Sequence, residues 1–316
     1  MTDRPEDLAL CEAVCAVNGL TLFHDGAGAK ITSFFQEHPD AVMFWDVDHP
    51  KAASPGAQNS VQSISQRLLR VKPHFDRIFV VSDNPLTELE HATHLAVFGH
   101  HLIRRYADPM PGIITRVIKA STMPDPFGIA KFAPAGVPIR KITLTESRHR
   151  TATIEALQNL YAKKGLPPGI VSNMAQAIDE LLMNAIFDAP VDEHGFNYRK
   201  TVDRSSPLRL GTREAVTLEL AEAPDHIIVS VADNFGSLDK ETVMGFIRKD
   251  YASENYRSKA NTVGAGLGVY GMTQSGQSLL FMSKPKERTE VLLYVPYTKS
   301  MKAYRNAFRF FGFIMR

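Results

Sequence analysis

The chain has 316 residues, 44% of them hydrophobic and 22% charged, and its formal net charge is +2. It is long enough for two domains with separate cores, and its composition is typical of a globular protein. The small net charge offers no footprint for nucleic acid, and no stretch approaches the roughly 18 apolar residues of a transmembrane segment. The sequence MTDRPEDLALCEAVCAV starts with acidic residues where a signal peptide carries positive charge, so we expect a cytoplasmic protein.

The first 120 residues alternate between helical and strand patterns. LALCEAVCAV has helical periodicity and contains both cysteines, Cys11 and Cys15, which we expect to be structural thiols. Apolar runs at 41–47 and 76–83, with one or two more in 94–106, are typical of strands, and the amphipathic stretch 60–71 is typical of a helix. The alternation predicts an α/β domain with a largely parallel sheet over residues 1–120.

Residues 121–138 contain four prolines and two glycines, which predicts a linker. The part that follows, 139–300, has a different pattern. Two helices are expected at 148–165 and 169–190, two strands at 213–222 and 225–234, a helix from about Lys240, and a strand hairpin in 277–297. This order predicts an α+β sandwich with helices on one face of a mixed, mainly antiparallel sheet.

The second of these helices places two polar side chains one turn apart. Glu180 and Asn184 therefore point at the same spot. A carboxylate can accept a proton, and an amide oxygen can coordinate Mg²⁺, which prefers oxygen ligands. An ordinary solvated helix face is the alternative interpretation.

Two further motifs are typical of a nucleotide site. Asp233 ends a strand and Gly236 follows it, so the carboxylate could accept a hydrogen bond from an exocyclic amine; an ordinary Asp-Asn turn is the alternative. Gly264, Gly266 and Gly268 lie in a loop that enters a helix, where free N–H groups could bind phosphate. The polar run 249–262 before them could close over a nucleotide as a lid.

Taken in order, these motifs over residues 139–297 resemble the ATP-binding domain of the GHKL family, which has the Bergerat fold. The resemblance implies that Glu180 is the acid/base residue, that Asn184 is a Mg²⁺ ligand, and that Asp233, with Gly236 beside it, binds the adenine amine. It also implies that Gly264, Gly266 and Gly268 line the phosphate loop and that Thr289 lies near the adenine. Two departures stand out: Arg288 replaces a glycine, and D-N-F-G-S has its glycine one place late, which leaves the lid hinge in question.

Within that family, the layout resembles the anti-sigma-factor serine kinases. One strand and one helix, which contains His149, precede the Glu180 helix, and this is too short for the dimerising hairpin of a histidine kinase. Residues 187–211 form an insertion that this branch does not explain.

The N-terminal part resembles a response-regulator receiver, which has a flavodoxin-like fold. Asp46 lies at the phosphoacceptor place, Ser82 at the hydroxyl position, and Arg104 or Arg105 where a lysine is expected. Residues 17–35 fit the second strand and helix, whereas the first strand with its acidic pair is missing, so we expect a degenerate receiver. Asp46 is a candidate phosphosite, with a structural or docking role as the alternative.

We therefore expect a Mg-ATP-dependent protein kinase (or ATPase) that acts on a serine or threonine of a regulatory protein partner. The alternative is a nucleotide-responsive binding module that sequesters a partner without phosphorylating it. A homodimer is compatible with either function. The tail, 301–316, is expected to pack Phe308, Phe310 and Phe311 on the ATP-binding domain, with a partner or membrane-surface contact as the alternative.

Overall fold

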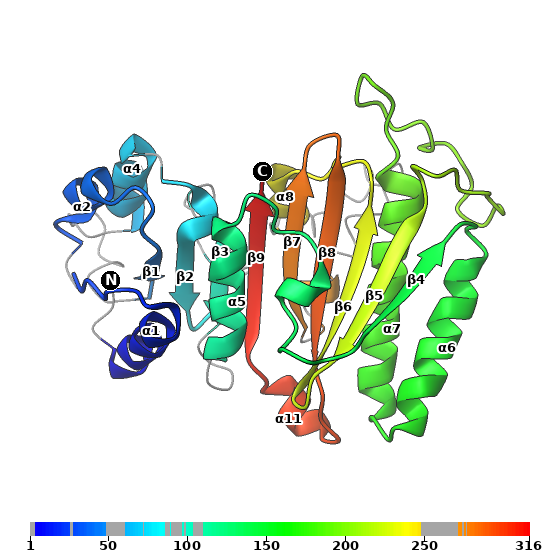
Figure 1. The fold of residues 1–316 in the computed structure, drawn as a ribbon, viewed down its shortest axis with the longest axis horizontal. Coiled ribbons are helices and arrows are strands. Elements are labelled where there is room, and N and C mark those ends of the chain that lie inside the picture. The colour runs from blue at the N-terminus through cyan, green and yellow to red at the C-terminus, as the bar shows by residue number, and fades with distance from the viewer. Residues whose placement is uncertain are drawn as a thin grey trace. The chain divides into compact units, whose positions relative to one another are not determined.

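A computed structural model of the chain describes residues 4–25, 28–48, 61–71, 73–85, 89, 97, 99–103, 110–247, 271–273, 275 and 277–316. The structure is mixed α/β (Figure 1). It divides into two compact units. Unit 1 comprises Met1–Pro126 with Phe308–Ile314, and unit 2 comprises Phe127–Ala307 with Met315–Arg316. No helix in the described ranges is long and apolar enough to cross a membrane.

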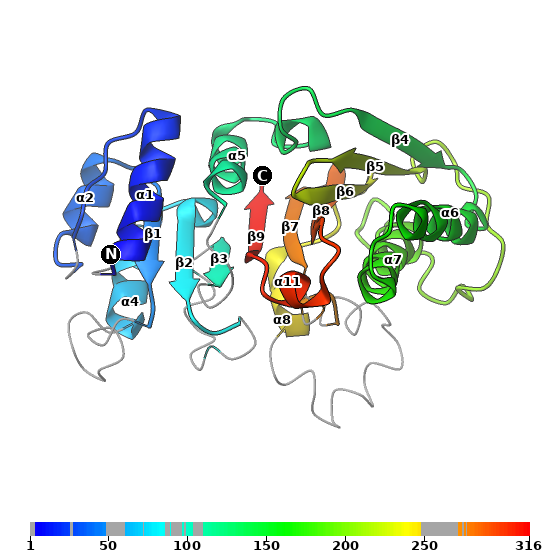
Figure 2. The ribbon, with the colours of Figure 1, turned by 90° about the horizontal axis from the view of Figure 1, so that it is seen from below.

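Unit 1 contains three parallel strands and one antiparallel strand. In chain order its elements are α1 (Pro5–Asn18), α2 (Ile31–Glu37), β1 (Met43–Asp46), α4 (Val61–Val71), a 3-10 turn (Phe75–Arg77), β2 (Ile78–Ser82), β3 (His100–Ile103), α5 (Pro111–Thr122) and β9 (Arg309–Met315). The strand order is β1-β2-β3-β9. Figure 2 shows α1 and α5 on one side of the strands β1 and β2 and α4 on the other.

Local sequence explains the main elements of unit 1. Helix α4 buries Val61, Ile64 and Leu68 at three- and four-residue steps, which is one face of an amphipathic helix. Every residue of β2 is buried, as expected for a parallel strand covered on both faces. Helix α1 starts with Pro5 at its first turn and ends at Gly19, whose φ of 64° is left-handed.

The predicted second strand within residues 17–35 is wrong. Residues 20–25 form no strand, and Leu20, Leu22 and Phe23 are 47%, 38% and 46% exposed. In a receiver this strand pairs with the first strand, and in the described part of unit 1 the strand order ends at β1. An apolar segment without a neighbouring ladder does not become a strand.

The tail forms a strand of unit 1, which corrects the expectation that its aromatic residues pack on the ATP-binding domain. Strand β9 pairs antiparallel with β3, with Phe311 opposite His101 and Phe310 opposite Leu102. Both phenylalanines are buried. The run RFFGFIM has the length and apolar content of a buried strand, but local pattern does not name its partner.

Unit 2 contains an antiparallel sheet covered by two long helices. Its elements are a 3-10 turn (Ile129–Lys131), β4 (Ile139–Leu144), α6 (His149–Lys163), α7 (Pro168–Met183), a π turn (Asn184–Asp188), β5 (Val216–Glu222), β6 (His226–Asp233), α8 (Lys240–Ile247), β7 (Ser278–Lys284), β8 (Arg288–Pro296) and α11 (Met301–Arg305). The strand order is β7-β8-β6-β5-β4. Each of these neighbouring pairs is antiparallel, where the sequence predicted a mixed sheet.

The apolar face of α7 is the centre of the unit 2 core. Ile170, Met174, Ile178 and Leu182 are completely buried, at the spacing of one helix face. Helix α7 packs against α6, β6 and β8. This contact leaves Glu180 and Asn184 on a different face, at the border of the core.

Candidate functional site

The C-terminal end of α7 changes from an α-helix to a π turn at Asn184–Asp188. The N–H of Ala189 donates to the carbonyl of Asn184 over 2.8 Å and closes this wider turn. Single π turns are rare and occur frequently at functional sites. Here the turn continues the row that Glu180 and Asn184 begin and adds Asp188.

Three oxygen atoms in this row have no hydrogen-bond donor among the described residues. They are Oε1 of Glu180, Oδ1 of Asn184 and Oδ2 of Asp188, and all three atoms are buried. Buried polar atoms are nearly always satisfied in proteins, so three together indicate a missing ligand. Two carboxylates and an amide oxygen are the donor set that a hard divalent cation prefers. The residues present therefore fit Mg²⁺.

The electrostatic environment of Glu180 suits a base near neutral pH. Burial raises the pKa of its carboxyl to about 7; the Arg204 guanidinium opposes this rise, and the carboxylates of Asp188 and Asp179 add to it. Burial also raises the pKa of Asp188, again opposed by Arg204. A general base is most effective when its pKa lies near the working pH.

The insertion is attached to the same end of α7. Arg204 forms an ion pair with Asp188 at 2.8 Å, and the Asn197 amide donates to the carbonyls of Phe187 and Asp188, each over 3.0 Å. The buried Arg199 donates to the carbonyl of Ile186 over 2.6 Å. Residues 187–211, which the sequence left without a place, thus hold the π turn in position.

Asp188 and Arg204 were missed by sequence reasoning. Asp188 lies eight residues after Glu180, which is the next step on the same helix face, so this signal was present in the sequence. For Arg204 there was no local signal, because its contact with Asp188 spans a long loop.

Asp233 and Thr289 lie opposite each other on neighbouring strands, β6 and β8, at the end where β6 stops. Burial raises the pKa of Asp233 to about 6, opposed by hydrogen bonds from the backbone N–H groups of Phe235 and Gly236. The N–H of Phe235 donates to Oδ1 over 2.8 Å, which is the Asp-Asn turn expected as the alternative. That turn leaves a binding role open, because a carboxylate has a second oxygen.

Glu290, beside Thr289, is a fully buried carboxylate that sequence reasoning also missed. It accepts hydrogen bonds from the Ser230 hydroxyl over 2.7 Å and the Gly128 N–H over 2.9 Å, and it pairs with Arg288 at 2.8 Å. Three donors satisfy this buried charge. Glu290 therefore fixes the start of β8, and Arg288 has a structural role where the GHKL family has a glycine.

Gly236 has a packing reason to be glycine. Its φ is +60°, and a Cβ at this position would lie 1.9 Å from the carbonyl oxygen of Lys284 in the turn between β7 and β8. The bare Cα therefore contacts protein backbone, where the sequence suggested room for a stacked base.

The second glycine motif and the lid lie outside the described residues. This applies to Gly264, Gly266 and Gly268 and to 248–262. Residues 271–273 just beyond them are helical.

In unit 1, Asp46 is buried at the end of β1. Its Oδ2 lies 3.4 Å from Nε of Arg4, and its Oδ1 accepts a hydrogen bond from the N–H of Asp48 over 3.0 Å. Arg4 also pairs with Asp83 at 3.0 Å. Within the described ranges, no three His, Cys, Asp or Glu side chains are arranged to hold a metal ion. A guanidinium therefore contacts the carboxylate for which a receiver uses Mg²⁺, while Arg104 and Arg105 lie outside the described residues.

No family model matches the chain, and no curated protein matches it. A solved structure with some similarity is the SiaB-SiaC complex from Pseudomonas aeruginosa. The TM-score is 0.30 and the sequence identity 15%, over 49% of this chain and 88% of that chain. A TM-score this low carries no argument about function.

Proposed function

We propose that unit 2 is a Mg-ATP-binding domain of the GHKL type and that the chain is a kinase acting on a serine or threonine of a regulatory protein. The observation that carries the proposal is the row of three buried oxygens on Glu180, Asn184 and Asp188 that lack a donor. A second support is the antiparallel sheet under α6 and α7, with Asp233 at the end of β6.

Each residue then has a defined role. Asn184 and Asp188 hold the cation, which neutralises phosphate charge when bound. Glu180 accepts the proton of the partner's hydroxyl group, which a carboxyl group with a pKa of about 7 can do at neutral pH. Asp233 accepts a hydrogen bond from the adenine amine.

Isothermal titration calorimetry of ATP, with and without Mg²⁺, tests the binding half of this proposal. We expect Mg²⁺-dependent binding to the wild-type chain and its loss in Asp233→Ala. Asp188→Asn should weaken the Mg²⁺ dependence while leaving metal-free nucleotide binding unchanged, because the amide keeps the shape and removes the charge. Asp192→Asn, an exposed carboxylate in the insertion, is the matched control. No binding by the wild-type chain would refute the proposal.

Phosphotransfer is tested separately with Glu180→Gln and radiolabelled ATP in the presence of partner proteins. Loss of transfer with ATP binding retained supports the kinase. If Glu180→Gln keeps every effect on the partner while Asp233→Ala removes it, the chain is a nucleotide-responsive binding module.

The binding module remains the second candidate because of two observations. Gly236 is accounted for by packing against Lys284, and the carboxylate of Asp46 is buried beside Arg4. In that case unit 1 is a pseudo-receiver with a flavodoxin-like layout that docks a partner without being phosphorylated. Its parallel strands β1, β2 and β3, with helices on both sides, support that layout.

A further inference from the structure

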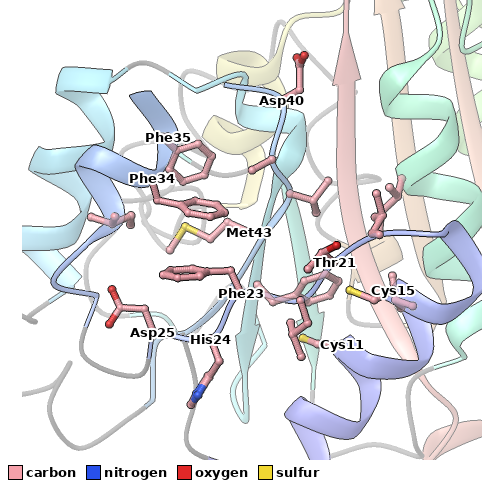
Figure 3. A pocket seen from close by; sticks show the side chains of 18 of the residues that line it. Cys11, Cys15, Thr21, Phe23, His24, Asp25, Phe34, Phe35, Asp40 and Met43 are labelled. Atoms are coloured by element: carbon pink, nitrogen blue, oxygen red, sulfur yellow. The ribbon is translucent and has the colours of Figure 1, made fainter. Parts of the chain in front are cut away.

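Unit 1 contains an apolar cavity of about 240 Å³ at the open side of its sheet. Helix α1, residues 20–25, α2 and residues 40–44 line it (Figure 3). Phe23 and Phe34 stack inside it with ring centroids 4.5 Å apart. Cys11 and Cys15, the two cysteines of the chain, both line it. We call this space the apolar cavity.

The position of the apolar cavity is that of a strand. Helix α1 packs on α5 and α2 packs on α4, so the cavity lies between two helical layers. The layer between two such helical layers is a sheet. In the described strand order β1 is the edge strand, and residues 40–44, which lead into β1 and begin it, form one wall of the cavity. A flavodoxin-like sheet has its first strand at this place.

The walls define the chemistry of the occupant. Apolar side chains reach the cavity both from α1 and from α2, so a strand there must be apolar on both faces, as in a buried parallel sheet. Figure 3 places Asp25 and Asp40 on different sides of the aromatic cluster, so basic residues at the ends of the segment would complement the rim. Leu20, Leu22 and Phe23 keep much of their surface exposed, and covering it favours binding.

We infer that unit 1 takes up an extended apolar segment of a partner protein in the apolar cavity, as an added strand beside β1. This is β-augmentation, in which main-chain hydrogen bonds provide affinity and side-chain pockets provide specificity. A second copy of this chain does not fit, since its own β1 carries α1 and α2 with it and these would collide with the walls. The inference is independent of ATP binding by unit 2.

Thiol labelling tests the inference on the full chain. Burial raises the pKa of Cys11 to about 12, and Cys11→Ala leaves Cys15, half-buried in the wall, as the reporter. The probe is a peptide of five alternating valines and isoleucines with two lysines at each end. The control peptide has the same sequence with alternate backbone nitrogens methylated, which keeps the apolar surface and removes hydrogen-bond donors.

At a peptide concentration ten times the Kd, we expect the rate of Cys15 modification by iodoacetamide to fall roughly tenfold. The methylated peptide should give no protection. Leu22→Lys, at a partly exposed position in the wall, should weaken protection more than tenfold, whereas Val17→Lys, an exposed apolar position outside the lining, should keep it.

A second measurement uses the same apolar segment fused to the N-terminus through a glycine-serine linker, which raises its effective concentration to the millimolar range. Protection of Cys15 in the fusion supports the inference. Three results would overturn it. The first is no protection by either the peptide or the fusion. The second is equal protection by the methylated peptide, which would indicate a site for apolar molecules without strand pairing. The third is protection that grows with protein concentration alone, which would indicate a second copy.

Discussion

Substitution of Gly236 by alanine tests whether this glycine serves packing or the nucleotide. A Cβ at position 236 would lie 1.9 Å from the Lys284 carbonyl oxygen, 2.8 Å from the carbonyl carbon and 2.9 Å from the Lys286 nitrogen. All three are backbone atoms, so no flexible side chain can move aside. The turn between β7 and β8 must shift, or residue 236 must leave its left-handed conformation.

Both responses cost free energy of unfolding. The left-handed backbone costs an alanine about 1–2 kcal/mol, and forced displacement of packed atoms typically costs about 1–3 kcal/mol. We therefore expect Gly236→Ala to destabilise unit 2 by roughly 2–5 kcal/mol. Gly136→Ala is the matched control, because Gly136 has a φ of +81° and no atom within 4 Å of a built Cβ. It should lose only the backbone part, about 1–2 kcal/mol.

Urea unfolding followed by far-ultraviolet circular dichroism measures both changes, and hydrogen exchange of β7 and β8 locates them. ATP titration of the same variants is the second readout. The packing argument is refuted if Gly236→Ala and Gly136→Ala lose the same stability. A Gly236→Ala variant of normal stability that no longer binds ATP would assign the glycine to the nucleotide.

Three further predictions concern the site and its insertion. Phosphotransfer should fall about tenfold per pH unit below pH 7, because Glu180 is then protonated, and rate measurements on Glu180→Gln should show a flat, low profile. Since the pKa of Asp233 rises from 3.8 to about 6, the folded chain holds a proton between pH 4 and 6 that the unfolded chain has lost. The free energy of unfolding should therefore decrease across that window as pH rises, by an amount on the order of 3 kcal/mol, and urea titrations of Asp233→Asn should lack this part. Asn197→Ala should cost about 1–2 kcal/mol because it leaves two carbonyls without donors, whereas Arg204→Met should cost less than about 1 kcal/mol because its ion pair is partly exposed; urea unfolding compares the two, and an equal loss would contradict the anchoring described for the insertion.

The elements of unit 2 were predictable from sequence. Helices α6 and α7 and strands β4 to β8 lie where apolar periodicity placed them, because each has one buried face that repeats along a single segment. The same periodicity placed Glu180 and Asn184 on one face, and a strand that ends at Asp233 was equally evident. The functions assigned to these residues stay predictions.

Other features depended on contacts between distant segments. The strand predicted in residues 17–35 did not form, although Leu20, Leu22 and Phe23 favour one, since strand formation needs a neighbouring ladder as well as apolar residues. Gly236 was assigned room for a base, yet the atoms nearest to it belong to the turn between β7 and β8.

The sequence by itself determined which segments are helices or strands and which of their faces are apolar, because hydrophobic periodicity is a property of one segment. Only the tertiary structure decided that β9 pairs with β3, that Arg204 pairs with Asp188, and that a cavity remains beside β1. Each of these is a choice among partners far apart in the chain. The free energy of such a contact depends on both partners and on everything else that competes for them, which no local pattern records.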